Sequence, residues 1–134
     1  MLNVLIIDNA EEIKPVLSGT VANIALHTDE VQALNAVEDS QPSVILLNYE
    51  VRKDQTADYI GLIRKANLES KIIVISDELS EEKIIKCLIA GAKGYQEAKQ
   101  LEAYVDKLIK VVDAGEAWIT RRMVAILLDS LIKN

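Results

Sequence analysis

Three short stretches of the chain are continuously apolar and have the length of a buried β-strand. They span residues 4–7, 44–47 and 72–75, are rich in β-branched residues, and each is followed by a polar residue. Strands of this kind are typical of parallel sheets that are covered on both faces. Two weaker strands are predicted at Asn23–His27 and at residues 94–96, after a glycine-containing turn. The pattern therefore predicts five strands.

Segments with a helical spacing of apolar residues lie between and after these strands. They cover residues 11–18, 30–37, 57–66, Glu81–Ala90 and 101–114. Ser80 is a suitable N-cap for the fourth of them because its hydroxyl can accept a free first-turn N–H, and Gly91 can end it. Alternation of strand and helix with short connections predicts right-handed crossovers and a three-layer α/β sandwich. Ligands of such sheets bind beyond the carboxyl ends of the strands, where Asp8, Asn48 and Ser76 begin the loops.

The pattern changes after Gly115. Residues 121–131 carry apolar side chains at helical spacing, which predicts a sixth, amphipathic helix. A terminal helix added to a complete sandwich often packs on a partner or leads into a further part of a protein. We therefore expect a domain at residues 1–114, followed by a linker and a C-terminal amphipathic helix at residues 115–134.

Composition narrows the class of protein. The chain has 134 residues, which suits one domain, and 21 acidic against 15 basic residues give a net charge of -6. A chain of this charge repels a phosphate backbone, so we do not expect it to bind nucleic acid unaided. Cys87 is the single cysteine and excludes an intrachain disulfide. The apolar stretches are too short to cross a bilayer and no signal peptide follows Met1, so we expect a cytoplasmic protein.

The polar residues after the first strand bear on the chemistry. These residues are Asp8, Asn9, Glu11 and Glu12, and the segment contains no glycine. A loop that binds phosphate needs bare backbone N–H groups without local negative charge, so a dinucleotide fingerprint and a P-loop are both disfavoured. A metal-dependent phosphotransfer site instead needs several carboxylates that converge from neighbouring strand ends around a cation such as Mg²⁺. Only Asp8 clearly meets that need.

Four segments taken together resemble the receiver domains of bacterial two-component response regulators. They are LIIDN at 5–9, VILLN at 44–48, VIS at 74–76 and AGAKGY at 90–95, in family order and at nearly family spacing. Residues 113–119 also resemble the last receiver helix and linker of NarL/LuxR-type regulators, which carry a C-terminal helix-turn-helix domain. The resemblance covers essentially the whole chain. It implies a doubly wound, CheY-like parallel sheet of order 2-1-3-4-5, with the last helix leading toward an output domain outside these residues.

The resemblance also implies where a phosphorylation site would lie. In an active receiver, an acidic pair after the first strand and an aspartate after the third bind Mg²⁺, and that aspartate accepts a phosphoryl group from a histidine kinase. In this sequence the acidic pair corresponds to Asp8 and Asn9, and the acceptor position is Asn48. Ser76 and Tyr95 stand at the two switch positions.

The family's lysine is displaced. It should lie three residues after Tyr95, where this chain has Ala98, and Lys99 comes one place later. Because side chains alternate between the faces of a strand, we expect this offset to direct Lys99 away from the site.

These departures predict a degenerate site. A neutral amide cannot form an acyl phosphate, so we expect no phosphorylation at Asn48. Two amides in place of carboxylates remove two negative charges from the cation site. Each of these charges would attract a unit positive charge by about 4 kcal/mol, before desolvation, at an effective dielectric constant of about 20. We therefore expect Mg²⁺ binding to be weak or lost, no cofactor, and a stability that barely responds to Mg²⁺.

Simpler interpretations stand beside these. From the residues alone, Asn48 could be a turn residue and Asp8 an N-cap. Glu50 is expected to be solvated, His27 to lie at the surface, and Cys87 to be a buried small hydrophobe.

The function that follows is a non-enzymatic receiver-like module that controls a DNA-binding output domain in transcription through protein contacts, independently of phosphorylation. The alternatives are a receiver that phosphorylates another carboxylate, Asp8 or Glu50, and a stand-alone adaptor. A haloacid-dehalogenase-like phosphatase would need an acid at Ala10, and a flavin or nucleotide binder would need a glycine loop.

The expected partners are a histidine kinase or another signalling protein, and a second copy of the chain. A homodimer is expected through the helices at residues 81–90 and 101–114. The apolar side chains on that side exceed what one helix face needs, although all of them could be core. They are Ile85, Leu88, Tyr95, Leu101, Tyr104, Val105 and Leu108.

Overall fold

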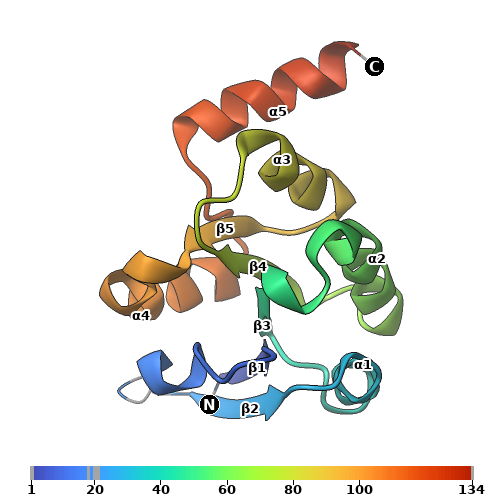
Figure 1. Cartoon of the computed structure of the whole chain (residues 1–134), viewed down its shortest axis with the longest axis vertical. Coiled ribbons are helices and arrows are strands. Elements are labelled where there is room, and N and C mark those ends of the chain that lie inside the picture. The colour runs from blue at the N-terminus through green and yellow to red at the C-terminus, as the bar shows by residue number, and fades with distance from the viewer. Residues whose placement is uncertain (1, 18, 20–21, 134) are drawn as a thin grey trace.

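A five-stranded parallel sheet forms the centre of the computed structural model, which describes residues 2–17, 19 and 22–133 (Figure 1). Every neighbouring pair of strands is parallel, and their order is β2-β1-β3-β4-β5. This confirms the predicted architecture and strand order. The strands are β1 (Asn3–Ile7), β2 (Asn23–His27), β3 (Val44–Asn48), β4 (Lys71–Ser76) and β5 (Gly94–Glu97).

Helices cover both faces of the sheet. Three of them, α1 (Glu30–Ser40), α2 (Thr56–Ala66) and α3 (Glu81–Ala90), lie on one face, and α4 (Leu101–Asp113) lies on the other (Figure 1). A fifth helix, α5 (Arg121–Lys133), follows them and confirms the predicted C-terminal helix. Short 3₁₀ turns complete the chain: η1 (Lys14–Leu17), η2 (Tyr49–Val51), η3 (Lys53–Gln55) and η4 (Ala98–Gln100).

The alternation of side chains along the strands divides the core in two. Leu5 and Ile45 belong to the half that packs against α1, α2 and α3, whereas Ile6 and Leu46 belong to the half that packs against α4 and η1. Both halves are predominantly aliphatic, with Tyr49 and Tyr59 also buried in the first, which explains why the central strands are apolar at every position.

The predicted helix at residues 11–18 is wrong. Within the described residues of this segment, only Lys14–Leu17 form a helical turn, and that turn is the 3₁₀ turn η1. Glu11 has a φ of 53°, in the left-handed region, which no right-handed helix contains. Pro15 has no N–H to donate to Glu11, so the backbone hydrogen bond that an α-helix would form between these residues is absent. Ser18 lies outside the described residues.

The predicted ends of α3 are confirmed. The hydroxyl of Ser80 accepts a hydrogen bond from the backbone N–H of Lys83 at 3.3 Å. Gly91 ends the helix with a φ of 124°, a conformation that only glycine adopts without strain.

The segment after α4 returns to the sheet. The backbone N–H of Trp118 donates to the carbonyl of Lys93 at 2.9 Å, and the N–H of Tyr95 donates to the carbonyl of Trp118 at 3.1 Å. Trp118 thus forms a parallel bridge beside Gly94 on the outer edge of β5. A Cβ atom on Gly94 would lie 2.2 Å from the Trp118 carbonyl oxygen, so this close approach requires glycine.

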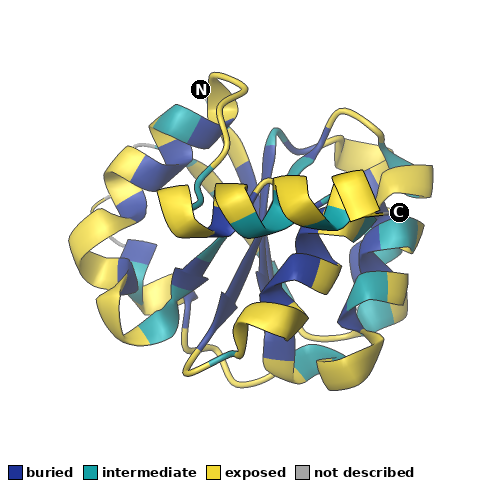
Figure 2. Cartoon of the chain, turned by 90° about the horizontal axis from the view of Figure 1, so that it is seen from above, coloured by how far each residue is buried: buried dark blue, intermediate teal, exposed yellow. Residues whose placement is uncertain are grey.

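From this bridge the chain enters α5, which lies over α3 (Figures 1 and 2). Met123 is buried in the same half of the core as α3, and Arg122 forms an ion pair with Glu81 at 2.6 Å. The domain boundary expected near residue 114 stays a prediction. α5, which follows that position, packs onto the core formed by the preceding residues. Among the described helices, none is both long and apolar enough to cross a membrane.

Candidate functional site

The candidate site lies at the carboxyl edge of the three central strands. Asp8 follows β1, Asn48 ends β3 and Ser76 ends β4. Because β1, β3 and β4 are neighbours in the sheet, the fold brings these three positions to one edge, as the sequence predicted.

The Asp8 carboxylate is completely buried, and both of its oxygens accept hydrogen bonds. Its Oδ2 accepts from the backbone N–H of Glu12 at 2.8 Å and of Ile13 at 2.9 Å. Its Oδ1 accepts from the backbone N–H of Ala10 at 3.3 Å and from the side-chain Nδ2 of Asn48 at 2.9 Å. Asp8 therefore caps the loop that leads to η1, the structural role that its position also suggested.

Asn48 is almost fully buried, and both ends of its amide are engaged. Its Nδ2 donates to Asp8, and its Oδ1 accepts from the backbone N–H of Glu50 at 2.9 Å, which makes Asn48 the N-cap of η2. An ionised aspartate here could not donate to Asp8. The amide is thus the chemical form that suits this environment, because only it offers a donor to Asp8 and an acceptor to Glu50.

These residues do not fit a bound Mg²⁺. A carboxylate has about four lone-pair positions, and the four N–H donors around Asp8 occupy them. The side chain nearest in sequence, Asn9, is exposed. Within the described part of the chain, no cluster of three or more His, Cys, Asp or Glu side chains could hold a metal ion.

Ser76 and Tyr95, which stand at the two switch positions of the resemblance, are joined by a hydrogen bond. The Tyr95 hydroxyl donates to the backbone carbonyl of Ser76 at 2.9 Å, while the buried Ser76 hydroxyl donates to the carbonyl of Asp77 at 3.4 Å. Burial raises the pKa of Tyr95. The Tyr95 ring packs against the core together with Ile119 of the C-terminal segment. Tyr95 links the carboxyl edge of β4 to the segment that leads into α5, because its hydroxyl donates to Ser76 and its backbone N–H donates to the carbonyl of Trp118.

Lys99 is exposed, and its Nζ lies 3.8 Å from a carboxylate oxygen of Glu78. It borders a small pocket of about 200 Å³ that Asn48 and Asp77 also line. The alternation of side chains along a strand does not determine the direction of Lys99, because β5 ends at Glu97 and Lys99 lies in η4. The ammonium group of Lys99 therefore lies beside the Glu78 carboxylate at the edge of this pocket.

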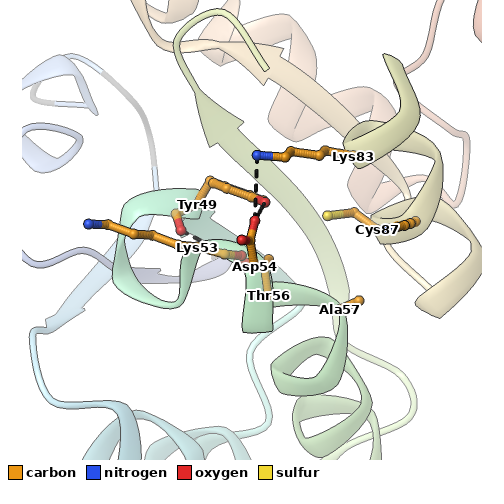
Figure 3. A pocket seen from close by; sticks show the side chains of 8 residues that line it. Tyr49, Lys53, Asp54, Thr56, Ala57, Lys83 and Cys87 are labelled. Carbon is orange, nitrogen blue, oxygen red and sulfur yellow. Dashed lines mark hydrogen bonds and ion pairs between the residues drawn. The ribbon is translucent and has the colours of Figure 1, made fainter. Parts of the chain in front are cut away.

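A second pocket, of about 310 Å³, lies between α3 and the turns after β3 (Figure 3). The Tyr49 hydroxyl donates to Asp54 at 3.3 Å, and the Nζ of Lys83 lies 3.5 Å from the same carboxylate oxygen. Burial, together with the charge of Asp54, raises the pKa of Tyr49 to about 12. No local motif joins residues about thirty positions apart, so the sequence does not mark these residues as a group.

The remaining expectations concern single side chains. Glu50 is exposed, His27 is partly buried at the end of β2, and Cys87 is buried. Burial raises the pKa of the Cys87 thiol to about 11, which keeps it protonated at neutral pH.

Most of the apolar side chains that suggested a homodimer belong to the core of the single chain. The buried members are Ile85, Leu88, Leu101, Val105 and Leu108. Tyr104 is exposed on α4, where its ring lies 6.4 Å from that of Trp118, and Tyr95 is partly buried. The homodimer stays a prediction, but these five side chains cannot form its surface.

Comparison with solved structures identifies the fold. The chain is similar to the isolated REC domain of RcsB from Salmonella enterica serovar Typhimurium in the apo form, with a TM-score of 0.82 and 16% identity over 96% of this chain and 99% of that one. It is similar to a LuxR-family two-component response regulator from Aurantimonas sp. SI85-9A1, with a TM-score of 0.78 and 12% identity over 97% of both chains.

A longer RcsB structure from Salmonella typhimurium, described for its conformational dynamism in DNA interaction, matches with a TM-score of 0.79 and 15% identity over 95% of this chain and 69% of that one. No protein-family model matches the sequence, and no curated protein matches it. At these identities the likeness shows the fold alone, and that fold is the one seen in response-regulator receiver domains.

Proposed function

We propose that the chain is an atypical receiver domain of two-component signalling, which accepts no phosphoryl group and transmits information through protein contacts. The observation that carries this proposal is the Asn48 amide, which donates to Asp8 at the position where a receiver has its phosphoacceptor. The receiver fold supports the general assignment, and the geometry around Asn48 supports the degenerate form of it.

The chemistry of the site argues against phosphorylation. An acyl phosphate forms when an ionised carboxylate oxygen attacks phosphorus, and the amide oxygen of Asn48 is neutral and already accepts from Glu50. The reaction also needs a divalent cation to neutralise the phosphoryl oxygens, and the lone pairs of Asp8 are engaged. Both requirements of the reaction are therefore unmet at this edge of the sheet.

The same geometry argues against a substitute acceptor. Asp8 has no exposed surface and makes four hydrogen bonds, so a phosphodonor cannot reach it without local unfolding. Glu50 is exposed and lies in η2, two residues beyond the end of β3. A receiver that uses either carboxylate is the alternative that the experiment below distinguishes.

We further propose that the output is a DNA-binding domain C-terminal to α5. The LuxR-family and RcsB comparisons support this, since the longer RcsB structure extends beyond the part that this chain matches and concerns DNA interaction. The net charge of -6 favours contact with nucleic acid only through such a domain. A histidine kinase or another signalling protein is the proposed partner for the receiver itself, and self-association is part of the proposal.

The test is incubation of the purified chain with Mg²⁺ and a small-molecule phosphodonor, followed by intact-mass spectrometry. A receiver of known phosphoryl-accepting activity in the same reaction is the positive control. The expected result is an unmodified mass for this chain and an adduct for the control. An adduct on this chain contradicts the proposal, and peptide mapping to Asp8 or Glu50 would then favour the substitute-acceptor alternative.

A further inference from the structure

α5 is apolar on two opposite sides. One side packs onto the core and carries Met123, Ile126 and Leu127. The opposite side, here called the outer face, consists of Val124, Ala125, Leu128, Leu131 and Ile132. Among the described residues, Leu128 is 53% exposed, Leu131 59% and Ile132 81%. A helix that is apolar nearly all round is normally covered all round, so the outer face lacks its cover in the single chain.

The orientation of this face is fixed by contacts on the inner side. Arg122 donates to Glu81 through Nε at 2.6 Å and through Nη2 at 3.1 Å, and Met123 is buried beside α3. With these contacts on the inner side, the outer face of α5 is turned away from the domain. In the view from above, α5 lies in front of the domain with much of its surface exposed, and in Figure 1 its C-terminal end points away from the sheet.

We propose that the outer face of α5 pairs with the same face of a second copy of the chain, in an antiparallel contact centred on Leu128. This inference deepens the self-association in the proposed function and moves it from α3 and α4 to α5. It does not depend on the absence of phosphorylation.

The spacing of the outer face fits a self-complementary pair of helices. Val124, Leu128 and Leu131 are separated by four and three residues, the spacing of a coiled-coil seam. In an antiparallel pair centred on Leu128, that residue meets its own copy and Val124 lies opposite Ile132. Ala125 then lies opposite Leu131, so that a small side chain faces a large one.

Charge favours this orientation over a parallel one. Arg121 lies on the outer face about one turn before Val124. Antiparallel pairing places it just beyond the last turn of the partner helix, where the unpaired carbonyl groups carry partial negative charge. Parallel pairing would instead bring the two copies of Arg121 together.

The size of the patch indicates a weak, reversible dimer. The outer face consists of five side chains on one helix, and a contiguous apolar patch on a single chain rarely exceeds a few hundred Å². Two such patches together fall below the roughly 1,200 Å² at which stable interfaces begin. We therefore expect a dissociation constant on the order of 10–100 μM.

Sedimentation velocity of the full chain from about 5 to 500 μM, a range that brackets this constant, tests the proposal. The expected result is a shift from monomer to dimer for the wild type and a monomer throughout for Leu128→Glu. Leu68→Glu is the matched control, because Leu68 is 65% exposed in the turn after α2, away from α5. A wild type that stays monomeric, a dimer that survives Leu128→Glu, or a dimer that Leu68→Glu also abolishes would overturn the proposal.

Disulfide trapping tests the orientation independently. Leu128→Cys should form an intermolecular disulfide under mild oxidation. Val124→Cys should not, because eight residues at 1.5 Å per residue place its two copies about 12 Å apart in the antiparallel pair, beyond the limit of about 7 Å between Cα atoms. The wild-type chain is the control, since its Cys87 is buried. Preferential cross-linking of Val124→Cys would contradict the antiparallel pair, and neither result affects the phosphodonor test.

Discussion

Replacing Asn48 by aspartate would place a second carboxylate against Asp8 inside the fold. In the wild type, Asn48 Nδ2 lies 2.9 Å from Asp8 Oδ1 and donates to it. Asn48→Asp keeps the shape of the side chain but turns this donor into an ionised acceptor. The hydrogen bond is lost, and two negative charges face each other in a site with almost no contact with solvent.

The magnitude follows from that distance. Two unit charges about 3 Å apart repel by about 5 kcal/mol at an effective dielectric constant of about 20. The folded variant can limit this cost by keeping one carboxyl protonated. Protonating a group of ordinary carboxyl acidity at pH 7 costs about 4 kcal/mol, which sets an upper bound. We therefore expect Asn48→Asp to lower the free energy of unfolding by about 3–4 kcal/mol at pH 7.

Urea denaturation at pH 7 and at pH 5, with and without Mg²⁺, measures this. The folded variant binds a proton that the unfolded chain does not, so its deficit relative to the wild type should shrink as the pH falls toward 5. Mg²⁺ should also reduce the deficit of Asn48→Asp, because a cation between two carboxylates relieves their repulsion. The wild type should be unaffected by Mg²⁺.

Asn48→Ala is the matched control, because it removes the same hydrogen bond without adding a charge. Its cost should be about 1–3 kcal/mol, with no recovery in Mg²⁺. The reasoning is refuted if Asn48→Asp is as stable as the wild type at pH 7 without Mg²⁺, or if Asn48→Ala shows the same dependence on Mg²⁺.

Three further predictions follow from other contacts. Tyr95→Phe removes the donation to the Ser76 carbonyl and should lower the free energy of unfolding by about 1 kcal/mol in urea denaturation; an unchanged value would contradict the contact. Gly94→Ala should push the Trp118 carbonyl off the edge of β5 and shift the fluorescence of this single tryptophan to longer wavelength, whereas an unchanged spectrum would show that the bridge is not formed. Burial raises the pKa of Cys87 from 9.0 to about 11, so the folded state favours the neutral thiol. The free energy of unfolding that this preference contributes is present below pH 9 and is lost between pH 9 and about 11. Cys87→Ala should lack that part of the alkaline loss, and an identical pH profile for the two proteins would argue against the buried thiol.

The strands could be predicted from the sequence because their side chains are buried on both faces. Every position of residues 4–7 and 44–47 is needed in one half of the core or the other, so the apolar runs are unbroken. The ends of α3 could also be predicted, because Ser80 and Gly91 act only on the adjoining turns of the helix.

The features that could not be predicted depend on contacts between distant segments. The expected helix at residues 11–18 is replaced by η1, because Glu11 has a positive φ in a loop whose N–H groups at Glu12 and Ile13 are held by the distant Asp8 carboxylate. The bridge of Trp118 to β5 and the packing of Met123 beside α3 join residues more than twenty positions apart, and no spacing in the sequence marks them.

The candidate site was predicted in its residue types but not in its geometry. The sequence places an amide at Asn48, but it does not show that this amide donates to Asp8 and accepts from Glu50. It also places Lys99 one residue late without showing that the chain has already left β5 at that point. These hydrogen bonds satisfy both ends of the Asn48 amide, which the order of residues alone does not reveal.

The most direct test of the central claim is a crystal structure of the wild-type chain grown in a high concentration of Mg²⁺. The expected result is density for the Asn48 amide at hydrogen-bond distance from Asp8, with no ion between them. An octahedrally coordinated cation bound by both side chains, with the amide turned away from Asp8, would contradict it.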